Sequence, residues 1–367
     1  MMSNHLYDGL MNAVQLDRLF AEIPSKNRPP TRYYTYGHVE EVSGRLANLL
    51  VHWGVEVGER VAVQVPKSIE AIMLYLACVR MGAIFLPLNT AYTPNEVDYF
   101  LSDSEVKIFI CAPNDQDKLT GVAVKNSTRL ETLGVYSNPD DFAGSVLAQA
   151  DSQPTKFNNV TRNATDLAAI LYTSGTTGRS KGAMLTHENL LSNSITLAKI
   201  WRFTKDDVLL HALPIYHTHG LFVAINVTLL SGASMIFLSE FNTDLLIKNL
   251  PRSSAMMGVP TFYTRLLDDQ RFNADLVSKM RLFISGSAPL LAETHVQFEQ
   301  RTGHRVLERY GMTETNMNTS NPYDGERRAG TVGQPLPDVE LRICDPETGH
   351  KVVAGEIGVL EIKGPNV

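Results

Sequence analysis

The sequence has few cysteines, few tryptophans and no long run of one charge. Its three cysteines, Cys78, Cys111 and Cys344, stand far apart, so none has the spacing of a metal knuckle or a CxxC redox motif. Scattered cysteines of this kind are typical of a reducing compartment and of small buried side chains. The sequence therefore predicts neither a disulfide framework nor a cysteine-based metal site.

Long apolar stretches and basic clusters are also missing. The run at 221–230 is interrupted by Asn226 and Thr228 and is too short to cross a bilayer. Residues 1–13 lack the basic stretch and apolar block of a secretory signal. The net charge of −6, without a Lys/Arg block, disfavours a nucleic-acid partner. We expect a soluble, cytoplasmic protein that binds small molecules and neither membrane nor nucleic acid; its oligomeric state stays open.

The remaining composition is that of an ordinary globular chain. Apolar residues make up 44% and charged residues 20% of the 367 positions, and this length favours two or three lobes. In the first third, apolar residues three or four apart alternate with short β-branched runs, which predicts helices that alternate with strands. The predicted helices cover 39–53, 69–81 and 94–102, and the predicted strands cover 61–65, 83–86 and 106–111.

A second series of strand patterns follows a polar connector at 134–163. Repeated βα units of this kind predict parallel, doubly wound sheets with helices between most strands. The strands of this second series are expected at 167–172, 208–212, 234–238, 255–258, 282–285 and 306–310.

The composition changes after residue 330, where glycine and proline are frequent. Two stretches follow, at 339–344 and 357–362, in which apolar and polar residues alternate as in half-buried strands. We therefore expect an α/β fold with two doubly wound βα subdomains and a small β subdomain. The predicted divisions are 1–165, 166–329 and 330–367.

The most informative segment is 172–182, with the sequence YTSGTTGRSKG, directly after an apolar strand. Its glycines let backbone N–H groups approach an anion, and its hydroxyl groups and lysine can bind phosphate oxygens. A Walker A loop would need glycine before the lysine and Ser or Thr after it, whereas Ser180 precedes Lys181 and Gly182 follows it. A second strand at 183–185 predicts a hairpin-like phosphate loop, and a P-loop phosphotransferase is disfavoured.

The segment 172–182 resembles the phosphate-loop signature of the adenylate-forming superfamily, which includes acyl-CoA synthetases, firefly-type luciferases and peptide-synthetase adenylation domains. Three more stretches are similar to family motifs and follow in the family's order. They are LPIYH at 213–217, SGSAP at 285–289 and YGMTE at 310–314. The resemblance extends over nearly the whole chain.

Within the superfamily, the segments 214–224, 259–267 and 308–315 are most similar to malonyl-CoA synthetases. This resemblance implies two steps. A carboxylate attacks the α-phosphate of ATP and expels pyrophosphate, and coenzyme A then displaces AMP from the acyl adenylate. The implied ligands are ATP, Mg²⁺, coenzyme A and malonate, and such chemistry depends mainly on positioning and charge stabilisation.

The resemblance also assigns site residues. Glu314, together with Thr173, is expected to bind Mg²⁺, since this cation prefers carboxylate and phosphate oxygens. The aromatic face of Tyr310 is expected to stack on adenine. The implied catalytic residues are His217, Lys181 and Glu314, and the implied nucleotide-binding residues are Thr173, Ser174, Gly175, Thr176, Thr177, Gly178, Lys181, Gly286, Ser287, Ala288, Tyr310, Gly311, Met312 and Thr313.

The acid is expected to contact His217, Ser285 and Arg265. A dicarboxylate leaves a second charge, and an unpaired buried carboxylate is costly. Arg265 follows the segment 259–264 at the start of a predicted helix, which lines the acyl pocket in the superfamily. Its guanidinium is expected to bind that second carboxylate through two parallel hydrogen bonds.

Full-length relatives carry a ribose-binding Asp, a hinge and a C-terminal lid with a catalytic Lys, whereas this sequence ends at 364–367, before such elements. We therefore expect it to bind ATP and malonate but to turn over slowly unless a lid is supplied. Two alternatives stay open. One is a ligase for another short acid, including methylmalonate, and the other is a non-catalytic nucleotide-binding module.

Overall fold

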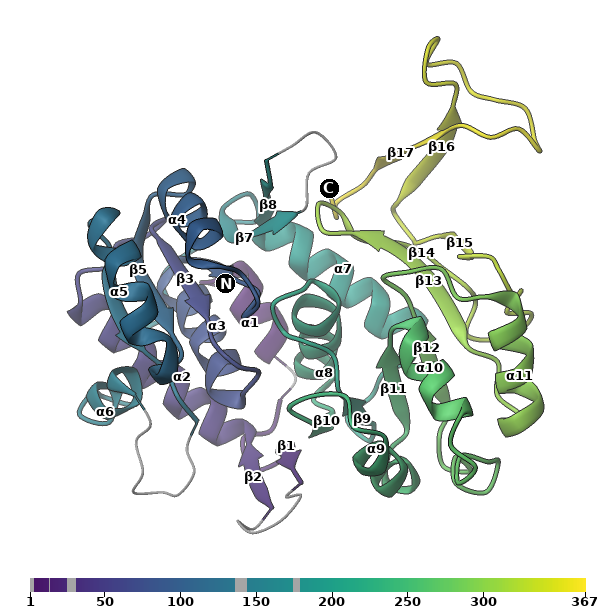
Figure 1. The fold of residues 1–367 in the computed structure, drawn as a ribbon, viewed down its shortest axis with the longest axis horizontal. Coiled ribbons are helices and arrows are strands. Elements are labelled where there is room, and N and C mark those ends of the chain that lie inside the picture. The colour runs from purple at the N-terminus through teal and green to yellow at the C-terminus, as the bar shows by residue number, and fades with distance from the viewer. Residues whose placement is uncertain (1–2, 13, 25–30, 136–143, 174–178) are drawn as a thin grey trace.

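The computed structural model describes residues 3–12, 14–24, 31–135, 144–173 and 179–367. Their strands form two sheets and a separate hairpin, with helices packed around the sheets (Figure 1). The predicted α/β class, with two βα subdomains and a small β subdomain, is confirmed. None of the helices in these ranges is long and apolar enough to cross a membrane.

The first sheet has six described strands and is parallel except at one edge, where the last two strands form an antiparallel pair. In spatial order its strands are β6 (Arg129–Thr132), β5 (Val106–Cys111), β3 (Arg60–Gln64), β4 (Ile84–Pro87), β7 (Leu167–Thr173) and β8 (Lys181–Thr186).

The second sheet has nine described strands, parallel in the middle and antiparallel at both edges. In spatial order its strands are β15 (Gln334–Pro335), β14 (Asn316–Ser320), β13 (Leu307–Met312), β12 (Leu282–Ser285), β11 (Ala255–Gly258), β9 (Val208–His211), β10 (Ser234–Phe237), β1 (Leu19–Ile23) and β2 (Arg32–Thr35).

Sheet membership does not follow the predicted division at residue 165. β7 and β8 were assigned to the second subdomain, 166–329, but they complete the first sheet, because β7 lies beside β4. The N-terminal strand β1 pairs in parallel with β10 and brings β2 into the second sheet. The chain therefore crosses between the sheets twice, and the subdomain boundaries themselves stay a prediction.

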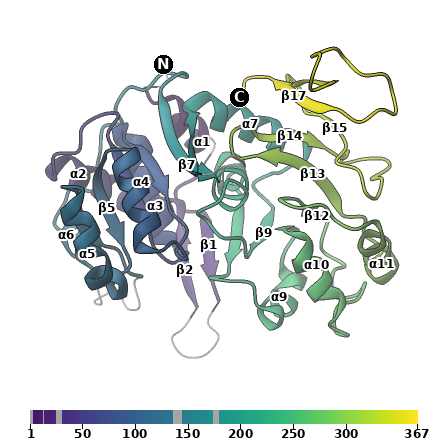
Figure 2. The same ribbon diagram turned by 45° about the horizontal axis from the view of Figure 1, so that its top comes forward.

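The helices fill the connections between strands (Figure 2). They are α1 (His5–Met11), α2 (Tyr36–His52), α3 (Ile69–Met81), α4 (Pro94–Asp103), α5 (Gln116–Lys125), α6 (Ser145–Ala150), α7 (His187–Ile200), α8 (Asn226–Ser231), α9 (Thr243–Asn249), α10 (Pro260–Leu267) and α11 (Ala292–Thr302), with short 3-10 turns η1 (Pro113–Asp115) and η3 (Leu250–Arg252) and a π-helix η2 (His219–Ile225).

Helix α3 shows why some boundaries can be predicted from the sequence. The Ser68 hydroxyl accepts a hydrogen bond from the Ala71 N–H at one end, and Gly82 adopts the left-handed conformation at the other. Every residue of α3 is buried, so the helix belongs to the core between the subdomains. The predicted range 69–81 is confirmed. The connector 134–163 was expected to be loop-rich, but its described part contains α6.

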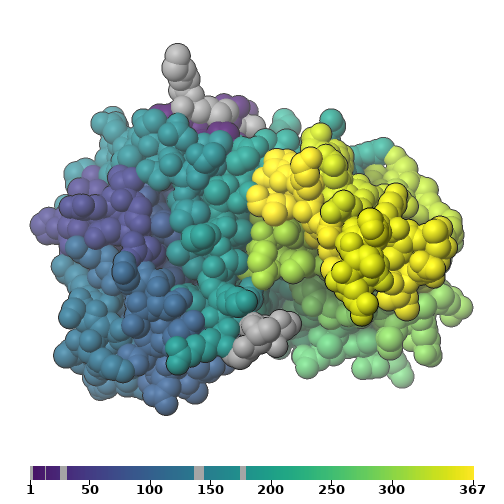
Figure 3. Space-filling view, turned by 90° about the horizontal axis from the view of Figure 1, so that it is seen from above, coloured from purple at the N-terminus to yellow at the C-terminus, as the bar shows by residue number. Residues whose placement is uncertain are grey.

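The C-terminal residues form the antiparallel hairpin β16 (Glu340–Cys344) and β17 (Val359–Lys363). In Figure 3 this hairpin, in yellow, stands over the second subdomain, across from the purple and blue first subdomain. The chain then returns to the middle of the molecule, where the Asn366 side-chain amide donates to the Thr315 carbonyl at 2.7 Å.

Candidate active site

The predicted phosphate loop connects β7 to β8. The two strands are antiparallel, and Thr173 faces Lys181 across them, with the Thr173 hydroxyl 3.5 Å from the Lys181 carbonyl oxygen. The hairpin is therefore confirmed. Lys181 is exposed at the end of β8, where its ammonium group is free to meet an anion from solvent. The predicted residues Ser174, Gly175, Thr176, Thr177 and Gly178 lie outside the described residues.

The YGMTE motif ends β13 and turns into β14. A Cβ on Gly311 would lie 2.0 Å from the Asn316 carbonyl oxygen, so only glycine lets the two strands approach so closely. Glu314 is exposed at the turn. Tyr310 is half-buried near the end of β13, and partial burial, followed by the charge of nearby Glu314, raises the pKa of Tyr310.

Helix α7 connects these two elements. It follows β8 directly, and its buried Asn193 side chain donates to the Met317 carbonyl at 2.8 Å and accepts from the Met317 N–H at 3.2 Å. The β13–β14 turn therefore stands beside the β7–β8 hairpin, as Figures 1 and 2 both show. The structure thus places Thr173 and Lys181 on the same side of the molecule as Glu314.

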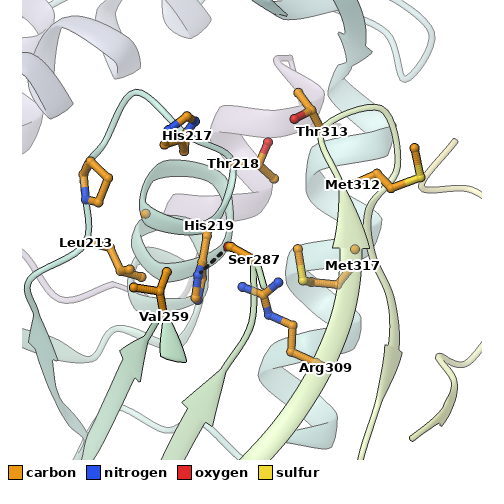
Figure 4. Close-up of a pocket in the computed structure, with 13 residues that line it drawn as sticks. Leu213, His217, Thr218, His219, Val259, Ser287, Arg309, Met312, Thr313 and Met317 are labelled. Carbon is orange, nitrogen blue, oxygen red and sulfur yellow. Dashed lines mark hydrogen bonds between the residues drawn. The ribbon is translucent and has the colours of Figure 1, made fainter. Parts of the chain in front are cut away.

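A cavity of about 410 Å³ lies between the β13–β14 turn, the loop after β9 and the loop after β12 (Figure 4). It brings together three of the four sequence motifs. The residues that line it are Leu213, Pro214, His217, Thr218, His219, Gly220, Val259, Ser287, Arg309, Gly311, Met312, Thr313 and Met317.

Two histidines form one wall of this cavity. His217 lies exposed beside Tyr216, with ring centroids 4.5 Å apart, and the desolvation of its ring lowers its pKa. His219 is buried, and its Nδ1 lies 3.2 Å from the Ser287 hydroxyl. Burial first, and then the positive charge of Arg309, lower the pKa of His219 well below its ordinary value. Both rings are therefore neutral near pH 7.

Arg309 forms the opposite wall and was not among the predicted site residues. Its side chain is 4% exposed, and burial lowers its pKa to about 9. Among the described residues, its Nε and Nη2 atoms have no hydrogen-bond partner. The guanidinium points toward Ser287 and His219 (Figure 4). A buried cation without an anion is costly, so this geometry favours an anionic ligand in the cavity.

The loop after β12 is shaped around Arg309. A Cβ on Gly286 would lie 2.3 Å from the Arg309 Cζ, so any larger residue there would push the guanidinium out of its present position. Ser287 adopts a φ of +70°, which is strained for a residue with a side chain and is common at functional sites. In the sequence, Arg309 stands beside Glu308 in the predicted strand 306–310 (VLERY), so its charge alone did not mark it as a site residue.

A second cavity, of about 310 Å³, shares Ser287, Arg309 and Gly311 with the first. The predicted residues Ser285, Ala288 and Tyr310 also line it, and the buried Ser285 hydroxyl has no partner among the described residues. An aromatic face, small side chains and free backbone fit a flat purine. The two cavities therefore adjoin each other at Ser287, Arg309 and Gly311.

Arg265 lies elsewhere. Its side chain is exposed on α10, with its guanidinium carbon 5.3 Å from the centroid of the Phe241 ring, and it lines neither of these two cavities. The prediction placed it against the acid because this helix lines the acyl pocket in the superfamily, and Val259, just before α10, does line the first cavity. The helix then carries residue 265 to its solvent face, so the structure does not bring it together with the other predicted residues.

Mg²⁺ was predicted at Thr173 and Glu314. No group of three or more His, Cys, Asp or Glu side chains that could hold a metal ion occurs in the ranges that the structure describes. One exposed carboxylate and one hydroxyl fit Mg²⁺ only if phosphate oxygens complete its octahedral shell. The Mg²⁺ contact of Thr173 and Glu314 therefore stays a prediction.

Comparison with known proteins agrees with this geometry. The family described as AMP-binding enzyme matches residues 20–367. The mitochondrial malonate–CoA ligase of Bos taurus is 35% identical over 84% of the chain and 57% of its own length. A malonate–CoA ligase of Arabidopsis thaliana is 30% identical over 91% of the chain and 60% of its own length. The chain thus spans somewhat more than half the length of these curated relatives.

Solved structures show the same fold. MatB from Rhodopseudomonas palustris, without ligand, has a TM-score of 0.94 and 53% identity, over the whole chain and 71% of that structure. A malonyl-CoA ligase with methylmalonyl-CoA and AMP bound has a TM-score of 0.80 and 31% identity, over 99% of the chain and 72% of that structure. The chain therefore belongs to the family of AMP-binding enzymes and has the fold of the N-terminal domain of adenylate-forming acyl-CoA ligases.

Proposed function

We propose that the chain binds ATP and malonate and forms the substrate-binding part of a malonate–CoA ligase. In the first step, one malonate carboxylate oxygen bonds to the α-phosphorus of ATP and pyrophosphate leaves. In the second step, the sulfur of coenzyme A bonds to the acyl carbon, AMP leaves and the thiol proton passes to solvent. The names of the relatives support this acid, and a cytoplasmic location stays a prediction.

The unpaired guanidinium of Arg309 is the observation that carries the proposal. Malonate has two carboxylates, and only one reacts. The second stays charged and needs a partner, which a buried guanidinium supplies through charge-assisted hydrogen bonds. A ligase for a fatty or aromatic acid would gain nothing from a buried cation at this place. The cavity therefore favours a short dicarboxylate.

The remaining groups have roles that follow from where they lie. The neutral His217 at the cavity wall can donate a hydrogen bond to the reacting carboxylate and orient it toward the nucleotide. Lys181 can stabilise the charge that develops on the leaving pyrophosphate. Glu314 and Thr173 would hold Mg²⁺, which neutralises phosphate charge when bound. Ser285, Ala288 and Tyr310 would bind adenine.

Calorimetry on this chain tests the proposal. With a non-hydrolysable ATP analogue and Mg²⁺ present, we expect malonate to bind, and methylmalonate if the cavity tolerates a methyl group. Acetate, which lacks the second carboxylate, should bind about 10- to 150-fold more weakly, because a charge-assisted hydrogen bond contributes about 1.5–3 kcal/mol. Equal affinity for acetate and malonate would contradict the assignment of a dicarboxylate.

Two arginine variants form the matched controls. Arg309→Met should remove the preference for malonate and leave the affinity for the ATP analogue within a few-fold of the original. Arg265→Leu should leave malonate binding unchanged, because Arg265 is exposed on α10. If Arg265→Leu loses malonate and Arg309→Met keeps it, the second carboxylate belongs to Arg265, as the sequence alone predicted.

Turnover separates the enzyme from the alternative of a non-catalytic nucleotide-binding module. Adding a separately expressed C-terminal domain from a full-length relative to this chain should produce malonyl-CoA, AMP and pyrophosphate. If the chain binds ATP and malonate but no added C-terminal domain produces turnover, the non-catalytic nucleotide-binding module is favoured instead.

A further inference from the structure

A half-buried lysine outside the two cavities connects the two subdomains through a chain of contacts. Lys67 lies in the loop between β3 and α3, in the first subdomain, and His211 ends β9, in the second. The Lys67 Nζ lies 2.7 Å from His211 Nδ1 and 3.0 Å from the His211 carbonyl oxygen. It also lies 4.3 Å from the centroid of the Phe237 ring, at the end of β10. None of these partners is a carboxylate.

The contacts fix the tautomer of His211. Its Nε2 lies 2.9 Å from the Gly220 carbonyl oxygen, which can only accept, so the proton of the neutral ring sits on Nε2. Nδ1 then carries a lone pair, which accepts from a Lys67 Nζ–H. Lys67 Nζ also donates to the His211 carbonyl, so a protonated His211 would point an N–H at a group that already acts as a donor. The arrangement therefore requires a neutral His211, in agreement with its pKa, which burial and then Lys67 lower well below the ordinary value.

Gly220 connects this chain of contacts to the candidate active site. It lies in the π-helix η2 and lines the first cavity, next to His219. A Cβ on Gly220 would lie 1.8 Å from the Pro214 carbonyl oxygen, so the start of η2 is pressed against the loop that carries His217. π-Helical segments are rare and occur often at functional sites. The Gly220 carbonyl is thus a fixed point of this cavity wall.

We propose that Lys67 is a positioning residue for the candidate active site. Through the ring of His211 it fixes the Gly220 carbonyl, and with it the wall formed by residues 217–220. Because Lys67 and His211 come from different sheets, the same contacts hold the two subdomains in register at the acid-binding cavity. This inference rests on the proposed function, since it assigns the wall a role in binding malonate.

Variants of the two residues test the coupling. Lys67→Met keeps the length of the side chain and removes the donors, and His211→Phe keeps a ring beside Phe237 and removes both nitrogen contacts. By calorimetry, each should raise the malonate dissociation constant about tenfold and change that of the ATP analogue less than about threefold. The double variant should be no weaker than either single variant, because both break one chain of contacts. Lys67→Arg should retain much of the malonate affinity that Lys67→Met loses.

Several outcomes would overturn the proposal. Unchanged malonate affinity in Lys67→Met, or additive losses in the double variant, would show that Lys67 does not act through His211. If Lys67→Met does not fold, as judged by circular dichroism, Lys67→Gln is measured in its place with the same criteria. Lys125→Met, at an exposed lysine, is the control for loss of a positive charge. Absence of malonate binding in the unchanged chain would instead contradict the proposed function.

Discussion

At the scale of single residues, the proposed malonate site depends on one cation, Arg309, for which the described residues supply no partner at two nitrogen atoms. Arg309 is buried, and no described residue binds its Nε and Nη2 atoms. Natural active sites often keep such unfavourable groups because the ligand compensates them. The free chain is therefore expected to be less stable than it would be with an apolar residue at this position.

Arg309→Met should accordingly stabilise the chain without ligand. Replacing an uncompensated buried charge by an apolar side chain of similar length is expected to raise the free energy of unfolding by about 1–3 kcal/mol. Urea denaturation measures this difference. Adding malonate should stabilise the unchanged chain and leave the variant as it was. A variant less stable than the unchanged chain would show that Arg309 has a structural partner.

Gly286→Ala tests the fit between the loop after β12 and Arg309. The added Cβ would lie 2.3 Å from the Arg309 Cζ, so the guanidinium must move. We expect malonate affinity to fall at least about tenfold, roughly 1.4 kcal/mol. Gly121→Ala is the matched control, because a Cβ there meets no atom within 4 Å and alanine favours the helix α5. Equal behaviour of the two variants would refute the fit.

Glu314→Gln tests the predicted metal contact. Loss of the carboxylate should weaken binding of the ATP analogue about tenfold in Mg²⁺, and chelation of the metal should remove the difference. Calorimetry with and without a chelator measures both. Glu347→Gln, another exposed carboxylate in a turn, should have no effect. A loss that persists without Mg²⁺ would argue against a metal role.

The sequence predicted the motif residues better than the residue that completes the site. The four motifs have fixed spacing, and three of them meet at one cavity. Arg309 was missed because a charged residue in a short strand is normally exposed on one face, and only the fold shows that both faces of β13 are covered there. Arg265 lies on a helix that begins beside the cavity but carries its side chain to solvent, so its predicted contact with the acid is left to the Arg265→Leu variant.

At the scale of elements, α7 holds the turn after β13 against the β7–β8 hairpin. Asn193 makes two hydrogen bonds to the backbone of Met317 on β14. Asn193→Ala leaves the buried Met317 N–H without this acceptor, which should cost about 1–3 kcal/mol of unfolding free energy. Urea denaturation measures the loss, with Asn95→Ala, exposed on α4, as the control. A change below about 0.5 kcal/mol would contradict this role for α7.

Elements with capping residues and a repeating βα pattern could be predicted, and isolated short strands could not. The range of α3 follows from Ser68 and Gly82 at its ends. β1 has five residues and no helix that leads back to a neighbouring strand, so its pairing with β10 is decided by tertiary contacts alone. The same is true of β7, which joins the first sheet although its sequence begins the second βα series.

At the scale of the whole molecule, stability should depend on pH through a buried histidine between α1 and α7. The Leu6 N–H donates to His187 Nδ1 at 3.2 Å, and burial, followed by the charge of Arg162, lowers the pKa of His187 to about 4. The unfolded chain binds the proton near pH 6.5, so stability is complete above that value and falls as the pH drops toward 4.

Between pH 7 and pH 5, this single group should remove about 2 kcal/mol of unfolding free energy. His187→Asn keeps an acceptor for the Leu6 N–H and does not titrate in this range. Urea denaturation at both pH values should therefore show a smaller loss for the variant than for the unchanged chain. Equal losses would mean that other groups dominate the pH dependence.

The most direct test of the central claim is a crystal structure of this chain with malonate and a non-hydrolysable ATP analogue. We expect a malonate carboxylate within hydrogen-bond distance of the Arg309 guanidinium, and adenine beside Tyr310. Malonate bound elsewhere, with Arg309 still unpaired, would contradict it.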